Sequence, residues 1–322
     1  MTDADAVGSD SLAPADWDDE SERAYARAQA ALADHCGVDA ESRTVDTTSA
    51  GTVHYLEAGD PDGEPVVCLH GVSTTGATWL PLVPALADGY RVLLPDRPGR
   101  GLSDAPSYTG RPLRLFLTEY LVELCDALGL QRPHVVGNSL GGQQAFLLAL
   151  DHDRVDRLCL AGAPGGVSKE FSPLWKLMTV RGVNRVLYWL NSLGDPGENA
   201  RESTAELLVA DDAAVPEPFY DVLAASSEMG ARQRSLRSLQ TAQGSFGRMH
   251  DTFDLTDELP GIERPTCFAW GTEDSFWPPE VGRPVADAMP DAEFHVLDGY
   301  GHMPWLEPGD EVGSLVRSFL DG

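Results

Sequence analysis

Short apolar runs alternate with longer amphipathic stretches along most of the chain. The alternating apolar pattern predicts strands at 43–48, 51–58, 65–69, 91–95, 134–136, 155–161, 265–270 and 293–297. Helical periodicity predicts helices at 79–87, 113–128, 140–150, 279–289 and 309–320. This alternation predicts an α/β fold, in which a mostly parallel sheet of eight strands carries helices on both faces.

Two segments depart from this rhythm. Residues 1–40 are acidic and rich in alanine, and they predict an N-terminal extension with one helix at 21–36. Residues 165–259 have mostly helical patterning and several large apolar side chains, so we expect a helical cap inserted between strands. The α/β core is then expected at 41–164 and 260–322.

The composition is that of a globular protein. At 322 residues and 42% hydrophobic content, the chain can bury a large core. No run approaches the ~18 apolar residues that a membrane-spanning helix needs, and the N-terminus is acidic instead of basic and then apolar. We therefore expect a protein that is neither membrane-spanning nor secreted, with a cytoplasmic location.

The charge is strongly biased. The chain has 51 acidic and 23 basic residues, a formal net charge of -28, and its lysines are Lys169 and Lys176. Such a charge repels nucleic acid and anionic membranes, so neither is an expected partner. The acidic side chains also repel one another, which weakens the compact state at low salt. Molar salt removes this cost by shortening the screening length to ~3 Å. The sequence favours a halophilic protein of a high-salt cytosol over an acidic protein of ordinary salt, and it leaves the oligomeric state open.

Neither the spacing of the cysteines nor any sequence motif suggests a prosthetic group. Five cysteines are spread without paired or metal-binding spacing, which indicates reduced thiols and no zinc site: Cys36, Cys68, Cys125, Cys159 and Cys267. No phosphate-binding loop, His-Glu-x-x-His or dinucleotide fingerprint is found. We expect a reaction without a metal or cofactor.

The stretch Gly137-Asn138-Ser139-Leu140-Gly141 joins a predicted strand to a predicted helix. A serine at such a sharp turn is exposed as a nucleophile, and the flanking glycines let strand and helix pass closely. The turn also directs the Leu140 N–H and the helix N-terminus at a developing negative charge. Ser139 is the candidate nucleophile.

The order of Ser139, Asp274 and His302 resembles the nucleophile, acid and histidine of the α/β-hydrolase fold superfamily, serine branch, over about residues 45–320. Asp274 follows a predicted strand in Gly271-Thr272-Glu273-Asp274, with Glu273 as its competitor. His302 follows the last strand in Gly301-His302-Met303-Pro304. The resemblance implies that Asp274 orients His302, which removes the serine proton.

The resemblance also implies an oxyanion hole. His70-Gly71-Val72-Ser73 directly follows a predicted strand, and in similar hydrolases the residue after His-Gly donates its backbone N–H. We assign this role to Val72, together with Leu140. His70 is expected to support the loop and not to react.

These features predict a serine hydrolase that cleaves a small carbonyl substrate, such as a carboxylic ester with an apolar part, through an acyl-serine intermediate. The stretch from Gly137 to Gly142, together with Gly162-Ala163-Pro164-Gly165-Gly166, is similar to carbon-carbon hydrolases of the meta-cleavage-product type and keeps that activity open. Two departures count against it: the loop after His70-Gly71 lacks that family's further Gly and Pro, and no Trp directly follows His302. A ligand-binding receptor or inactive scaffold on the same fold is the alternative from another class. Substrate contacts are expected from Ser73, Asn138, Trp175, Trp189 and Phe276.

Overall fold

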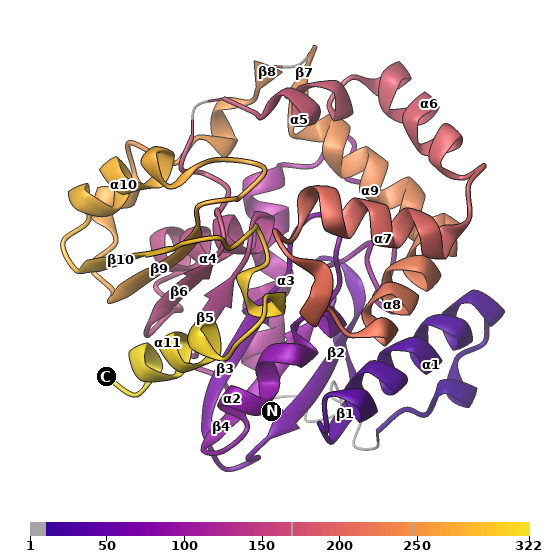
Figure 1. Ribbon diagram of the computed structural model, residues 1–322, viewed down its shortest axis with the longest axis horizontal. Helices are drawn as coiled ribbons and strands as arrows, with labels where there is room; N and C mark the ends of the chain where they lie inside the picture. Colours follow the sequence, from indigo (N-terminus) through magenta and orange to yellow (C-terminus); the bar gives the residue numbers. More distant parts are fainter. Residues whose placement is uncertain (1–10, 169, 247) are drawn as a thin grey trace.

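A central sheet of eight strands organises the protein (Figure 1). The computed structural model describes residues 11–168, 170–246 and 248–322. The strands are β1 (Ala40–Thr47), β2 (Gly51–Gly59), β3 (Glu64–Leu69), β4 (Tyr90–Pro95), β5 (His134–Gly137), β6 (Leu158–Ala161), β9 (Thr266–Gly271) and β10 (Ala292–Leu297). Their spatial order is β1-β2-β4-β3-β5-β6-β9-β10.

Strand β2 runs antiparallel to both of its neighbours, and all other pairs from β4 to β10 are parallel. The predicted α/β fold with a mostly parallel eight-stranded sheet is confirmed. Strand β6 is shorter than its predicted range of 155–161. The preceding helix ends at His152, and Asp153 after it adopts a left-handed backbone with φ 51°. The residues from 154 to 157 then connect this helix to β6 and are not part of the strand.

Helices cover both faces of the sheet. Val67 and Leu69 of β3 pack into the core beside α3 (Leu113–Ala127), α4 (Leu140–His152) and α10 (Pro279–Ala288). Val66 and Cys68 point the other way, as alternate strand residues must, into the core beside α1 (Glu20–His35), α2 (Val83–Leu86) and α11 (Glu311–Leu320).

The helix predicted at 79–87 is only partly α-helical. A 3₁₀ helix, η2, spans Gly76–Leu82, and α2 follows for one turn. Pro81 lies inside η2 and Pro84 in the first turn of α2. Because proline has no backbone N–H to donate, this segment cannot complete a regular α-helical ladder.

The chain between β6 and β9 is mostly helical and lies above the sheet in Figure 1. It contains α5 (Pro173–Met178), α6 (Arg181–Asn191), α7 (Pro196–Leu207), α8 (Glu217–Glu228) and α9 (Gly230–Ala242), with a small hairpin of β7 (Gly244–Ser245) and β8 (Arg248–Met249). Its division at 165 and 259 as a cap stays a prediction.

The N-terminal segment packs against this helical region. Helix α1 lies along α8, and Glu22 of α1 forms an ion pair of 2.7 Å with Arg232 of α9. The N-terminal extension therefore contacts two helices of the segment between β6 and β9. No helix in the described ranges is long and apolar enough to cross a membrane.

Candidate active site

Ser139 stands at the junction of β5 and α4 with a strained backbone, φ 54° and ψ -120°. Glycine is required on either side of Ser139 because other parts of the backbone come very close there. A Cβ on Gly137 would lie 2.7 Å from Cα of Gly142, and one on Gly141 would lie 2.0 Å from the Leu69 carbonyl oxygen. The sequence thus folds into the sharp strand-to-helix turn that presents Ser139.

Asp274 and His302 form a buried hydrogen-bonded pair. Nδ1 of His302 lies 2.7 Å from Oδ2 of Asp274, and the carboxylate also accepts from the backbone N–H groups of Ala163 at 3.0 Å and Phe276 at 2.9 Å. Burial acts to raise the pKa of Asp274, but the charge of His302 and these hydrogen bonds together hold it below its ordinary value. Asp274 is therefore an anion that can fix the tautomer of His302.

The competitor Glu273 is placed differently. Its side chain is exposed, and its backbone N–H donates to the Tyr300 carbonyl. Among the described contacts, His302 pairs with Asp274 and makes no interaction with Glu273.

Three loops hold Ser139 and His302 at one edge of the sheet. The Asn138 side-chain amide donates to the carbonyls of Ala161 at 2.7 Å and His302 at 2.8 Å. The Gly165 N–H donates to the Ser139 carbonyl at 2.8 Å. The His302 ring packs 4.4 Å from the Phe276 ring, which lines the same cavity as Ser139.

The predicted oxyanion positions flank Ser139. Leu140 is the first residue of α4, so its N–H precedes the intrahelical hydrogen bonds. Val72 lines the cavity, and its carbonyl accepts a hydrogen bond of 2.7 Å from the buried Arg97 guanidinium. Both residues therefore lie where backbone N–H groups can face a bound substrate.

His70 orients the peptide that carries the Val72 N–H. Its Nε2 accepts from the backbone N–H of Arg97 at 3.0 Å, so the proton resides on Nδ1, which donates to the Gly71 carbonyl at 2.7 Å. That carbonyl and the Val72 N–H belong to one trans peptide and point in opposite directions. Burial first, and the charge of Arg97 next, lower the pKa of His70 to about 3, so the ring is neutral.

A cavity opens beside Ser139. Its lining is mainly apolar and aromatic, and its polar side chains are a serine and two glutamines. The lining residues are Val72, Ser139, Leu140, Gln143, Gly165, Gly166, Phe171, Trp175, Gln243, Met249, Phe253, Phe276 and Trp277. None of these described lining residues carries a charged side chain.

Two of the five predicted substrate contacts, Trp175 and Phe276, line this cavity. The structure does not place the other three there. Asn138 is buried and uses its amide to connect loops, Ser73 points to solvent, and Trp189 lies on the outer side of α6 with 59% of its surface exposed. The apolar pattern that suggested Trp189 indicates which face of a helix the residue lies on. It does not indicate whether another part of the protein covers that face.

Gln143 and Gln243 are site residues that the sequence reasoning missed. Gln143 lies one helical turn after Ser139 on α4, a spacing that could have placed it beside the nucleophile. Its amide donates to the Phe253 carbonyl at 3.1 Å. Gln243 accepts from the Trp175 indole at 3.0 Å, and no spacing to Ser139 indicates it.

A serine on a strained strand-to-helix turn, an aspartate–histidine pair at the neighbouring strand ends and an apolar cavity define the class of α/β hydrolases. A family model described as alpha/beta hydrolase fold matches residues 64–308. The chain belongs to this family.

Relatives support the same class. A 2-hydroxy-6-oxononadienedioate/2-hydroxy-6-oxononatrienedioate hydrolase of Paraburkholderia phymatum is 31% identical over 289 residues, 87% of this chain and 96% of the relative. A thermophilic esterase of Thermogutta terrifontis has a TM-score of 0.69 at 26% identity, covering 87% of this chain and 98% of its own.

The fold is also that of a carboxylesterase from Bacillus subtilis, with a TM-score of 0.74 at 22% identity and coverage of 94% and 99% of the two chains. The protein is thus a hydrolase, as predicted, and the receptor or scaffold alternative is not favoured.

Proposed function

We propose that the protein hydrolyses neutral carboxylic esters with an apolar part, and that Ser139 is the nucleophile. Its Oγ attacks the ester carbonyl while His302 takes the hydroxyl proton, and the backbone N–H groups of Val72 and Leu140 hold the oxyanion. The carbon–oxygen bond then breaks, and His302 gives the proton to the leaving alkoxide. Water, deprotonated by His302, releases the acid and restores Ser139.

The absence of charged side chains among the described lining residues of the cavity carries the choice of a neutral substrate. A carboxylate that enters an apolar cavity without a cation loses its hydration with little return. An uncharged ester has no such cost, and the surrounding rings of Phe171, Trp175 and Phe276 favour apolar groups.

Carbon-carbon bond hydrolysis is the second candidate, because the relative from Paraburkholderia acts, by its name, on 2-hydroxy-6-oxo dienedioates. Such substrates carry carboxylates. If this chain accepts them, the side-chain amide N–H groups of Gln143 and Gln243, which line the cavity, must take the place of a cation.

Parallel assays separate the two activities. Purified protein is tested with nitrophenyl esters of increasing acyl length and with a 2-hydroxy-6-oxo dienoate, and we expect ester turnover at a rate well above dienoate cleavage. Dienoate cleavage without ester turnover would establish the second candidate instead.

Fluorophosphonate labelling tests the nucleophile itself. We expect labelling of the wild type and none of Ser139→Ala. Ser73→Ala is the matched control, since Ser73 is an exposed serine that does not belong to the described lining of the cavity, and it should label normally. Labelling that persists in Ser139→Ala would overturn the assignment.

We further propose that the protein works in a high-salt cytosol. The net charge of -28 supports this, because self-repulsion at low salt opposes the compact state and is screened in molar salt. Activity and helical circular dichroism are measured from low to multimolar KCl. Both should rise with salt, whereas full activity and structure at low salt would contradict the proposal.

A further inference from the structure

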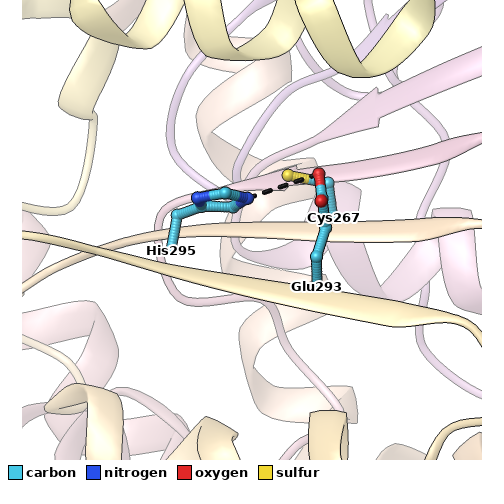
Figure 2. Close-up of side chains that lie close together, drawn as sticks. All are labelled: Cys267, Glu293 and His295. Atoms are coloured by element: carbon cyan, nitrogen blue, oxygen red, sulfur yellow. Dashed lines mark ion pairs between the residues drawn. The ribbon is translucent and has the colours of Figure 1, made fainter. Parts of the chain in front are cut away.

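Three potential metal ligands gather on the last two strands, away from the cavity. Figure 2 shows the Glu293 carboxylate and the His295 ring turned toward the Cys267 sulfur. Their ligand atoms all lie within 4.8 Å of one another. Glu293 is directly opposite Cys267 in the parallel register of β10 and β9, and His295 follows two residues later on the same face.

The spacing of these atoms suits a tetrahedral ion. Nε2 of His295 lies 3.3 Å from Oε1 of Glu293. Two ligands bonded at about 2.0 Å with a tetrahedral angle between them are separated by about 3.3 Å. This Nε2 atom is shielded from solvent and makes no hydrogen bond of regular geometry, and the contact described for it is the ion pair with Glu293, whose carboxylate would bind the same ion.

The three residues of the cluster differ in their exposure to solvent. Cys267 is fully buried and gives a fixed sulfur, whereas the side chains of Glu293 and His295 are 49% and 40% exposed. The carboxylate and imidazole therefore lie between the sulfur and solvent, which provides an entry path for an ion.

We propose that Cys267, Glu293 and His295 form a binding site for a zinc-like divalent cation. A thiolate, an imidazole and a carboxylate are the donor types that Zn²⁺ takes, and water completes the fourth position. On binding, the sulfur–metal bond forms as the Cys267 proton leaves to solvent. The ion joins edge strand β10, which leads into the His302 loop, to β9 and so has a structural role.

Cobalt binding to the full chain is the direct test. Protein treated with a chelator and dialysed is titrated with Co²⁺ in high KCl under reducing conditions. We expect saturation at one ion per chain, with a thiolate-to-cobalt charge-transfer band and intense visible bands of four-coordinate cobalt. Zn²⁺ should displace the cobalt and raise the melting temperature.

Variants decide whether these three residues are the ligands. Cys267→Ser should abolish the charge-transfer band, and His295→Gln, on a partly exposed edge position, should weaken binding at least tenfold while the fold is kept. Cys36→Ser, which removes a thiol outside the cluster, and Ser139→Ala should bind like the wild type. Absence of saturable binding, or a wild-type band in both Cys267→Ser and His295→Gln, would overturn the proposal.

Discussion

The side-chain amide of Asn138 donates a hydrogen bond of 2.8 Å to the backbone carbonyl of His302. The residue directly before the proposed nucleophile thus holds the loop of the proposed base. The same amide nitrogen donates to the Ala161 carbonyl at 2.7 Å, at the end of the adjacent strand β6. Asn138 is buried, so both carbonyls depend on it instead of on water.

Asn138→Ala should lower kcat at least tenfold with a smaller change in KM, because the base loses its position while the cavity stays intact. Leaving two buried carbonyls unpaired should also cost about 1–3 kcal/mol of unfolding free energy. Steady-state kinetics and denaturant unfolding measure both effects. Asn199→Ala, which removes an exposed amide bonded to the Asn191 carbonyl, is the control. Equal kcat values for the two variants would rule out this positioning role.

Asp274→Asn should reduce kcat by about 10⁴-fold while the folded structure is retained, because the amide cannot stabilise the His302 imidazolium and favours the wrong tautomer. Glu273→Gln tests the neighbouring acid in the same way. Since Glu273 is exposed, that variant should keep a wild-type rate. A large loss in Glu273→Gln and none in Asp274→Asn would exchange their roles.

The buried, neutral His70 should make the protein less stable in mild acid, because the unfolded chain takes up a proton there that the folded chain does not. The folded pKa of about 3 lies below the ordinary value of 6.5, so the stability that neutral His70 contributes is complete above about pH 6.5 and falls as the pH drops toward 3. Between pH 7.5 and pH 5 this group alone should remove about 2 kcal/mol. His70→Gln, which does not titrate, should lack that part of the loss in denaturant unfolding at both pH values.

The same substitution probes the oxyanion peptide. Because His70 holds the Gly71 carbonyl at 2.7 Å, His70→Gln should lower kcat more than it raises KM. His152→Gln, a half-buried histidine bonded to Thr118, is the matched control and should leave kcat unchanged.

For the pH prediction on His70, identical pH slopes of stability in the wild type and His70→Gln would contradict the titration argument.

The sequence revealed the parts of this site whose signals are local. Ser139, Asp274 and His302 each follow a strand end within a short motif, and the carboxyl ends of parallel strands meet at one edge of a sheet. The lining from Phe171, Gln243 and Met249 could not be found in this way, because its place depends on how helices pack above the sheet.

The cluster of Cys267, Glu293 and His295 was hidden for a related reason. The cysteine spacing contains no metal motif, and the register of β9 with β10 brings the three residues together. Register follows from the pairing of whole strands, which residue spacing alone does not give.

Trp175 and Trp189 lie in the same helical region but face different surroundings. Trp175 lines the cavity and donates its indole N–H to Gln243, whereas Trp189 is 59% exposed on α6. Trp175→Ala should lower kcat/KM for apolar esters about tenfold, since about 1.4 kcal/mol of lost apolar contact corresponds to that factor. Trp189→Ala should change kcat/KM less than twofold. A series of acyl lengths sharpens the test, because the loss in Trp175→Ala should grow with the length of the acyl chain. If Trp189→Ala produced the larger and length-dependent loss, the apolar substrate would have to bind against α6 instead of in the cavity beside Ser139.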